Sequence, residues 1–280
     1  EFVQVPTVEK VKDEGLMFLV TFDGHNAKAD FAKGSPDSFA AKDVDLGLRG
    51  LIGFDRQSAY PSIPREELRF PGRGNFDPHK GTVSFWMQGI DYNPSDAETD
   101  GKKRGNVILA RFVASDGGER ETDYKIYEFA DQLYFDWLTT PNKNKWGQGA
   151  RAHAVRKACK KGEWHQIVGT WDDDRIKLYL DGELVDQGKI NAAERNTADL
   201  MPGDAPHSYV GIRSFEWDDK HAWGVGVDDF AVYGRALNED DVFDRASDAQ
   251  HVEVESYQDD GAGGVQKTVL VGQDGVPCAK

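Results

Sequence analysis

The sequence is poor in cysteine and in long apolar runs. Its 280 residues include 2 cysteines, Cys159 and Cys278, which are too few for a disulfide framework and lack the spacing of metal ligands. One bridge between them and two free thiols both remain open. The longest unbroken aliphatic or aromatic run, Leu16 to Val20, is far shorter than the roughly 20 residues that span a bilayer. We therefore expect no membrane insertion.

Basic residues are outnumbered by acidic ones. The chain has 34 Lys and Arg against 49 Asp and Glu, a net charge of -15, whereas binding to phosphate backbones requires clustered positive charge. This balance argues against nucleic acid and against anionic membrane surfaces as partners. An apolar fraction of 39% with 11% aromatic residues is too high for a disordered acidic chain, and 30 Gly with 11 Pro indicate many turns. The composition predicts a turn-rich globular protein.

The sequence is rich in segments in which apolar residues recur at every second position. Val83, Phe85 and Met87 share one face of the segment from Thr82 to Gln88, which is typical of a half-buried strand. The same pattern predicts strands at Leu16–Phe22, Val107–Phe112, Tyr124–Phe129, Leu133–Leu138, His165–Trp171, Ile176–Leu180, Leu184–Gln187, Tyr209–Ile212 and Val227–Tyr233. So many short strands predict an all-β sandwich or jelly roll.

Two local patterns are specific. Asp181-Gly182 stands between apolar strands and favours a type I′ hairpin turn. Helical periodicity is scarce, and the best candidate is one short C-terminal helix over Asn238 to Ala249, with Asn238 as its N-cap and acidic residues in the first turn.

The chain divides into three parts by composition. We expect an N-terminal extension over residues 1–14, one jelly-roll domain over residues 15–250, and a tail or the start of a further segment over residues 251–280. Segments without strand patterning are expected to be loops, and long loops often carry function. These are Phe31–Ser58, Tyr92–Lys103, Thr139–Ala150 and Ile190–Pro206.

Three segments in order resemble one family. They are Leu68–Trp86 (LRFPGRGNFDPHKGTVSFW), Gly162–Trp171 (GEWHQIVGTW) with the following Asp-Gly hairpin, and Val227–Leu237 (VDDFAVYGRAL). Together they resemble the laminin G-like branch of the concanavalin A-like lectin and glucanase superfamily, over about Gly15 to Val242. The opening residues from Leu19 to Gly24 (LVTFDG) also resemble that family's first strand.

The resemblance implies a jelly roll of two curved antiparallel sheets that binds a glycan or polysaccharide. Such domains are often non-catalytic modules of secreted, periplasmic or cell-surface proteins, attached to further domains, and they commonly hold structural calcium. Calcium takes several oxygen ligands, and we expect Asp23 with Asp228 and Asp229 to supply them where the first and last strands meet. Hydrogen bonds from turn amides, or a contact with Arg235, would satisfy these carboxylates equally well.

Tryptophans fall into two classes. Trp86, Trp164 and Trp171 lie in strand patterns, where we expect a large ring to fill the space between the sheets. Trp137 alternates with Leu133 and Phe135 and is also expected in the core. Trp146, Trp217 and Trp223 instead stand among Gly, Lys, Asp and Asn, as sugar-contacting residues would. The predicted ligand-binding residues are Trp146, Arg213, Trp217, His221 and Trp223.

Two rival functions use the same fold, and the first is a polysaccharide-degrading enzyme, either a glycoside hydrolase or a lyase. A glycoside hydrolase needs paired carboxyl groups; Glu121 and Asp123 alternate, but they follow a Gly-rich turn and are expected in a solvated loop. A polysaccharide lyase needs a base and a cation for the uronate carboxylate, and the candidates are Arg111, Tyr124, Lys125, Tyr127 and His221. The other rival is a protein-interaction domain.

Overall fold

A computed structural model describes residues 14–22, 28–42, 45–46, 52–53, 67–89, 107–117, 121–129, 132–140, 149–155, 164–190, 204–215, 225–250, 253–259 and 265–271. Its elements are β1 (Leu16–Val20), β2 (Phe31–Ala32), β3 (Ala40–Lys42), β4 (Asp45–Leu46), β5 (Ile52–Gly53), β6 (Glu67–Pro71), β7 (Gly81–Gly89), β8 (Val107–Ser115), β9 (Glu121–Phe129), β10 (Gln132–Thr140), β11 (Gly149–Val155), β12 (Trp164–Trp171), β13 (Arg175–Leu180), β14 (Glu183–Lys189), β15 (Tyr209–Phe215), β16 (Val225–Tyr233), α2 (Glu239–Gln250), β17 (Glu253–Asp259) and β18 (Val265–Val271).

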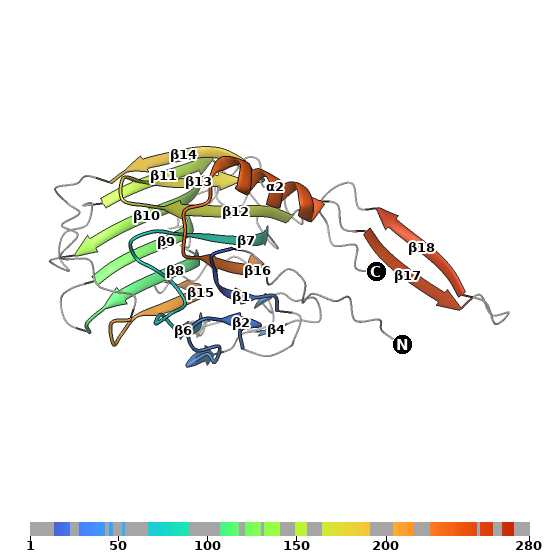
Figure 1. Cartoon of the computed structure of the whole chain (residues 1–280), viewed down its shortest axis with the longest axis horizontal. Coiled ribbons are helices and arrows are strands. Elements are labelled where there is room, and N and C mark those ends of the chain that lie inside the picture. The colour runs from blue at the N-terminus through green and yellow to red at the C-terminus, as the bar shows by residue number, and fades with distance from the viewer. Residues whose placement is uncertain are drawn as a thin grey trace, which may run out of the picture.

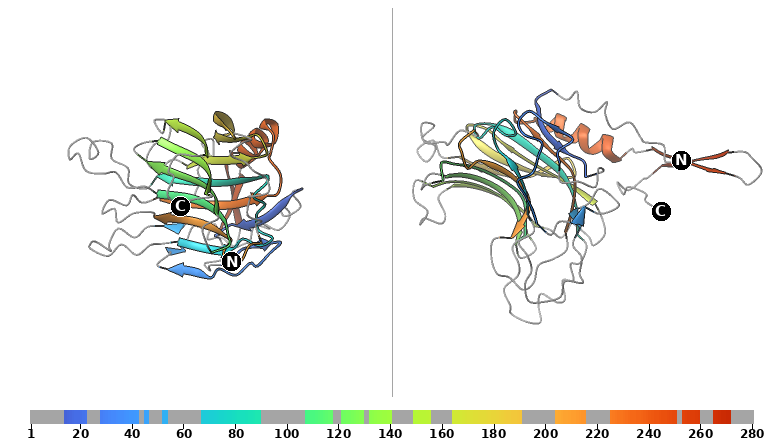
Figure 2. Two further views of the ribbon diagram at one scale, coloured as in Figure 1. Left: turned by 90° about the vertical axis from the view of Figure 1, so that its left-hand side faces the viewer. Right: turned by 90° about the horizontal axis from the view of Figure 1, so that it is seen from below.

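Two seven-stranded antiparallel sheets form a sandwich (Figures 1 and 2). Sheet 1 has the order β14-β13-β12-β7-β16-β1-β2, and sheet 2 has the order β11-β10-β9-β8-β15-β6-β3. Two small two-stranded sheets, β4-β5 and β17-β18, complete the described part of the chain. The predicted all-β sandwich with one short C-terminal helix is confirmed. No helix among the described residues is both long enough and apolar enough to cross a membrane.

The core lies between the inner faces of the two sheets and is rich in aromatic rings. Phe230 of sheet 1 stacks on Phe85 at 5.7 Å and on Phe112 of sheet 2 at 6.2 Å between ring centroids. Trp171 is fully buried, and its Nε1 donates a hydrogen bond to the Asp77 carbonyl oxygen at 2.9 Å. The period-two alternation in the sequence therefore places one face of each strand in this core.

Trp86 and Trp164 are not core residues, which corrects the prediction made from their strand patterns. Both are only half-buried, because their neighbours in the alternation occupy the core. Phe85 lies in the core on β7, and Ile167, three residues after Trp164, does so on β12. Successive side chains of a strand point to opposite faces of the sheet, so Trp86 cannot point between the sheets when Phe85 does. Trp171 and Trp137 are fully buried in the core, as predicted.

The two local patterns are confirmed. Asp181 and Gly182 both have positive φ angles, 52° and 85°, as a type I′ turn requires, and they connect β13 to β14. Asn238 caps α2, because its Oδ1 accepts a hydrogen bond from the Asp241 amide at 2.8 Å. The Arg235 guanidinium also donates to the Asp241 carboxylate, and this hydrogen bond lowers the pKa of Asp241.

Several strands lie where the sequence predicted loops. Short strands β2 to β5 fall within Phe31–Ser58, and Gly149 and Ala150, at the end of the predicted Thr139–Ala150 loop, begin β11. Glu121 and Asp123 belong to β9 rather than to a solvated loop. In the tail, the mostly apolar segment Lys267–Val271 predicts one strand, which lies within β18, whereas its partner β17 carries no such pattern.

The two sheets meet along one edge, where β14 of sheet 1 lies against β11 of sheet 2. The His153 amide donates to Asp186 Oδ2 at 2.9 Å across this edge. A Cβ atom on Gly188 would come within 2.5 Å of the Arg151 carbonyl oxygen, so the close approach requires glycine there. β11 is the edge strand of sheet 2, and this contact joins it to the edge strand of sheet 1.

Candidate functional site

The outer face of sheet 2 carries aromatic and charged side chains. On β10, Leu133, Phe135 and Trp137 are buried in the core, so the alternate residues Tyr134 and Asp136 lie on the opposite face. The same alternation holds on the adjoining strands β8, β9 and β11. The candidate site is the outer face of these four strands.

A row of charged residues crosses the strands. Arg111 on β8 is the register partner of Lys125 on β9. Asp136 on β10 pairs with Lys125 on one side and with Arg151 of β11 on the other. Since neighbouring strands lie about 4.8 Å apart, the row from Arg111 to Arg151 extends for about 14 Å.

Arg111 is held by acidic residues of the adjacent strand. Its Nε and Nη2 donate to the two Asp123 carboxylate oxygens at 3.1 and 2.8 Å. Glu121 lies 3.7 Å from the same guanidinium. Beyond Arg111, Gly211 of β15 separates it from Arg69 of β6 in the register. The register row therefore spans six strands, and five of them contribute a charged residue.

An aromatic row runs beside the charged row. Tyr134 on β10 is the register partner of Tyr127 on β9 and of His153 on β11. The Tyr127 and Tyr134 rings lie 5.1 Å apart at 14°, and the His153 ring lies 6.1 Å from Tyr134 at 25°. The Arg151 guanidinium carbon is 5.2 Å from the Tyr134 ring centroid, within the range of a cation–π contact.

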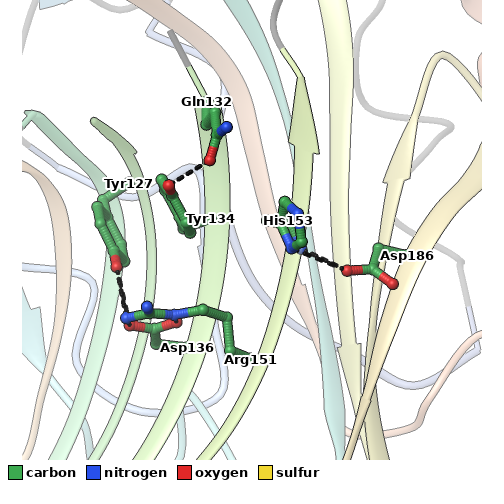
Figure 3. Close-up of polar contacts among 7 residues, drawn as sticks. All are labelled: Tyr127, Gln132, Tyr134, Asp136, Arg151, His153 and Asp186. Atoms are coloured by element: carbon green, nitrogen blue, oxygen red, sulfur yellow. Dashed lines mark hydrogen bonds and ion pairs between the residues drawn. The ribbon is translucent and has the colours of Figure 1, made fainter. Parts of the chain in front are cut away.

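Asp136 joins the two rows, as Figure 3 shows. Its carboxylate accepts two hydrogen bonds from Arg151, 2.7 Å from Nε and 2.8 Å from Nη2. The Tyr127 hydroxyl donates to Asp136 Oδ2 at 2.9 Å and accepts from Arg151 Nη2 at 3.0 Å. Charge-assisted, bidentate bonds of this kind fix orientation as well as adding energy. The three side chains form one rigid unit.

Burial and charge set the protonation state of this unit. The Asp136 side chain is 3% exposed, whereas the Arg151 side chain above it is 57% exposed. Burial, followed by the negative charge of Asp136, raises the pKa of Tyr127 well above its ordinary value. The hydrogen bonds that Arg151 donates to Asp136 raise the pKa of Arg151. At neutral pH the Tyr127 hydroxyl is therefore a hydrogen-bond donor.

The arrangement can contact a polar ligand with apolar patches. The aromatic row offers ring carbon, and the charged row offers fixed donors and acceptors. Among the described residues, the charged side chains of this face are Arg69, Arg111, Lys125 and Arg151 with Glu121, Asp123 and Asp136, and Asp186 of β14 lies at its border with sheet 1. Basic and acidic groups therefore nearly balance on this hydrogen-bonding surface, in a chain whose net charge is -15.

Most of the predicted ligand residues lie outside the described part of the chain. These are Trp146, Trp217, His221 and Trp223. The backbone of Arg213 lies in β15, and its side chain is not described. Thr140 precedes the segment with Trp146, and Phe215 precedes the segment with Trp217 and Trp223. Thr140 pairs with Glu121, which pairs with Ser115 at one end of β8, whereas Phe215 pairs with Val107 at the other end. These two strand residues therefore lie at opposite ends of sheet 2. The joint ligand surface of the two Trp-containing segments remains a prediction.

The predicted calcium residues lie partly within the described ranges. β1 and β16 pair as expected, with Val20 opposite Phe230, and Asp23 lies outside the described residues. A bulge follows Asp228: Asp229 has a φ of 47° and is exposed, and its amide donates to Asp228 Oδ1 at 2.9 Å. Neither carboxylate enters the core, because the bulge interrupts the alternation. Within the described ranges, no three His, Cys, Asp or Glu residues are clustered around a metal-sized space.

The residues weighed for a lyase come together only in part. Arg111, Lys125 and Tyr127 share the outer face of sheet 2, with Lys125 Nζ 5.2 Å from the Tyr127 ring centroid. Tyr124 points into the core, where its hydroxyl donates to the Pro78 carbonyl oxygen. His221 lies outside the described residues.

Sequence reasoning missed Asp136, Arg151 and His153. β11 was not predicted, although Ala150, Ala152 and Ala154 alternate with Arg151, His153 and Val155. Alternation that uses alanine as its apolar member gives a weak signal, because alanine is not specific to strands. Asp136 lies in the predicted strand Leu133–Leu138, and the alternation of that strand places it on the face opposite Trp137.

The chain belongs to the concanavalin A-like lectin/glucanases superfamily, since that family's model, Laminin_G_3, matches residues 65–243. The resemblance drawn from the sequence motifs is confirmed. No curated protein matches the chain.

Among solved structures, receptor-binding domains of botulinum neurotoxins share the fold. The type G domain is 14% identical with a TM-score of 0.55, over 85% of this chain and 53% of that one. A structure described as "Cell entry of botulinum neurotoxin type C is dependent upon interaction with two ganglioside molecules" is 11% identical with a TM-score of 0.58, over 87% and 53%. A type DC binding domain "in complex with rat synaptotagmin II" is 9% identical with a TM-score of 0.55, over 93% and 63%. This chain therefore spans little more than half the length of these proteins.

Proposed function

We propose that this chain is a carbohydrate-binding module of a secreted or cell-surface protein, and that the outer face of β9, β10 and β11 contacts the glycan. The observation that carries the proposal is the placement of Tyr134. Its ring lies between Tyr127 and His153, directly beside the Asp136–Arg151 ion pair. A ganglioside-binding relative of the same fold adds weight to a glycan as ligand.

The chemistry of this surface suits a sugar ring. Pyranoses present C–H groups that contact aromatic carbon, and hydroxyls that both donate and accept hydrogen bonds. Tyr134 and His153 supply the aromatic contact. Arg151 supplies exposed donors, and its fork is held in place by Asp136. Because these groups are fixed before binding, little side-chain entropy is lost when the ligand arrives.

The charge of the surface favours a neutral glycan. Arg111 and Arg151 each present two hydrogen bonds to a carboxylate of this chain, Asp123 and Asp136 respectively. A ligand carboxylate would have to displace one of these internal partners, whereas a hydroxyl can use the remaining N–H groups. Binding should therefore depend only weakly on ionic strength.

The protonation state of Tyr127 also favours a binding module over a lyase. A tyrosine that removes a proton from a uronate must first lose its own, and the raised pKa of Tyr127 opposes this. A glycan that is bound and recovered intact supports the module; chain shortening on product analysis would favour the rival enzymatic function.

The test is a glycan array, followed by titration calorimetry with the tightest neutral ligand. We expect Tyr134→Ala to weaken binding about tenfold, and Arg151→Met to weaken it similarly, since central aromatic and Arg contacts usually dominate an interface. Arg175→Met is the matched control, because Arg175 is exposed on sheet 1. Equal affinity for wild type, Tyr134→Ala and Arg151→Met would reject this surface as the binding site.

We also propose structural calcium at the junction of β1 and β16. The donor chemistry fits, because Asp228 and Asp229 offer carboxylate oxygens beside a bulge whose carbonyls are turned from the regular ladder. These two residues would hold the ion, together with Asp23. Calcium supplies positive charge that neutralises the neighbouring carboxylates when it is bound.

A further inference from the structure

Helix α2 covers part of the outer face of sheet 1. Helix α2 crosses one end of the sheet, where Glu239 pairs with Lys177 of β13 at 3.1 Å and Arg245 donates to the Tyr233 hydroxyl of β16 at 2.7 Å. Buried apolar residues form a second cluster beneath it, namely Leu16, Val168, Tyr179, Ala231, Tyr233, Leu237 and Val242. Figure 2 (right) shows α2 on the outside of the sandwich.

The other end of this face carries two tryptophans. Gln166 of β12 is the register partner of Trp86 on β7, and Trp86 is in turn the partner of Asp228 on β16. Trp164 lies two residues before Gln166 on the same face, diagonal to Trp86. Diagonal neighbours in an antiparallel pair are within reach of large aromatic side chains. The two half-buried indoles therefore flank Gln166.

Gln166 is the unusual residue of this group. It is 3% exposed, and its Oε1 is buried with no hydrogen-bond partner. Its backbone is fixed, since its amide donates to Asp181 Oδ1 at 2.8 Å and its carbonyl accepts from the Asp181 amide at 2.9 Å. Buried acceptors are almost always satisfied in folded proteins, so this unpaired acceptor, on the same sheet face as two indoles, is suited to a donor that arrives with a ligand once the Gln166 side chain turns outward.

We propose that Trp86, Trp164 and Gln166 form a second carbohydrate site, for a neutral pyranose, on the sheet opposite the first. Indole rings contact the apolar C–H groups of the sugar, and one sugar hydroxyl donates to Gln166 Oε1. The described side chains of these two rows include the Asp228 carboxylate and no cationic group, so an anionic sugar is disfavoured. This site does not depend on the one proposed for sheet 2.

Two sites on opposite faces would let one chain bridge two glycan strands. The sheets of a sandwich pack about 10 Å apart, so a single oligosaccharide cannot reach both sites through the core. On a polymeric ligand the second contact becomes effectively intramolecular and raises the avidity. Binding to a polysaccharide should then be tighter than binding to any short oligosaccharide of the same sugar.

The test uses a double variant, Tyr134→Ala with Arg151→Met, in which only the second site remains. Cellohexaose, xylohexaose and maltohexaose are titrated into it by calorimetry. We expect at least one of them to bind with one site per chain, and Trp86→Ala in the same background to weaken it about tenfold or more. Lack of binding by all three hexasaccharides, or an affinity that Trp86→Ala leaves unchanged, overturns the proposal.

Gln166→Met keeps the inference testable if Trp86→Ala does not fold. Methionine has nearly the same shape and removes the unpaired acceptor, so the melting temperature should be equal or higher. Affinity for the same hexasaccharide should nevertheless fall about tenfold. Retained affinity in Gln166→Met would show that the acceptor contributes nothing to a ligand. Because the first site is already absent, neither result bears on the function proposed for it.

Discussion

The outer faces of the two sheets are built from strands with the same alternation, yet they carry different residues. On sheet 1, Val168 and Ala231 lie beneath α2 in an apolar cluster. On sheet 2, Asp136 and Lys125 occupy comparable central positions and are similarly buried, and among the described residues Asp136 is covered by polar groups such as Arg151 rather than by a helix. A helix over one face requires apolar residues beneath it. An uncovered face can keep paired charges and remain available to a ligand.

The contrast between the two faces of a single strand predicts the largest effect. Phe135 is fully buried in the core and Tyr134 lies beside it on the outer face. Phe135→Ala should lower the free energy of unfolding by about 3–5 kcal/mol, whereas Tyr134→Ala should change it by less than about 1 kcal/mol and weaken glycan binding. Urea unfolding and calorimetry on both variants measure this. Similar destabilisation by both would mean that Tyr134 is structural.

The covered face of sheet 1 can be broken in the same way. Val242 of α2 is fully buried, and its neighbour Phe243 is 57% exposed. Val242→Asp places an unpaired carboxylate in the apolar cluster and should lower the free energy of unfolding by about 3 kcal/mol. Phe243→Asp, the matched control, should change it by less than about 0.5 kcal/mol. Two equal values would show that α2 does not depend on this packing.

Calcium at the β1–β16 junction should stabilise sheet 1 selectively. An ion that binds only the folded state contributes about 2.7 kcal/mol at a hundred times its dissociation constant, which corresponds to a melting temperature higher by roughly 5–10 °C for a domain of this size. Addition of EDTA should remove this increment, and Asp228→Asn should abolish the response. A sample shown to contain calcium whose melting temperature is the same in EDTA contradicts the proposal.

Alkaline pH should act on the buried unit of sheet 2. The pKa of Tyr127 is raised in the folded state above its ordinary value near 10, so the unfolded chain loses this proton first as the pH rises. The associated stability is complete below pH 10 and declines above it, by about 1.4 kcal/mol at pH 11. Tyr127→Phe should lack this decline. Parallel stability–pH curves for the two proteins would rule out the shift.

The fold was largely predictable from the sequence. Strands such as Thr82–Gln88 are predictable because large apolar residues alternate with other residues. Asp181-Gly182 predicts the hairpin turn between β13 and β14. Helix α2 was found through its Asn238 cap. β11 was missed because alanine provides a weak apolar signal, although Ala150 is buried opposite Trp137 in the register.

The candidate site was harder to predict, for a physical reason. Asp136, Lys125 and Arg151 become neighbours only through the register of three separate hydrogen-bonded strands, and a one-residue slip would invert the faces. Trp86 and Trp164 were wrongly expected in the core because of the size of their rings, although the alternation along β7 and β12 places them on the opposite face. Trp146, Trp217 and Trp223 lie outside the described residues, and their role remains a prediction.

The claim that the outer face of sheet 2 binds glycan can be tested at single residues by NMR of protein labelled at tyrosine side chains. A neutral oligosaccharide selected on the array is added while the ring resonances are followed. Those of Tyr127 and Tyr134 should shift with ligand concentration, and those of Tyr124, whose ring faces the core, should not. Saturable binding that leaves the Tyr127 and Tyr134 resonances unmoved would contradict the account.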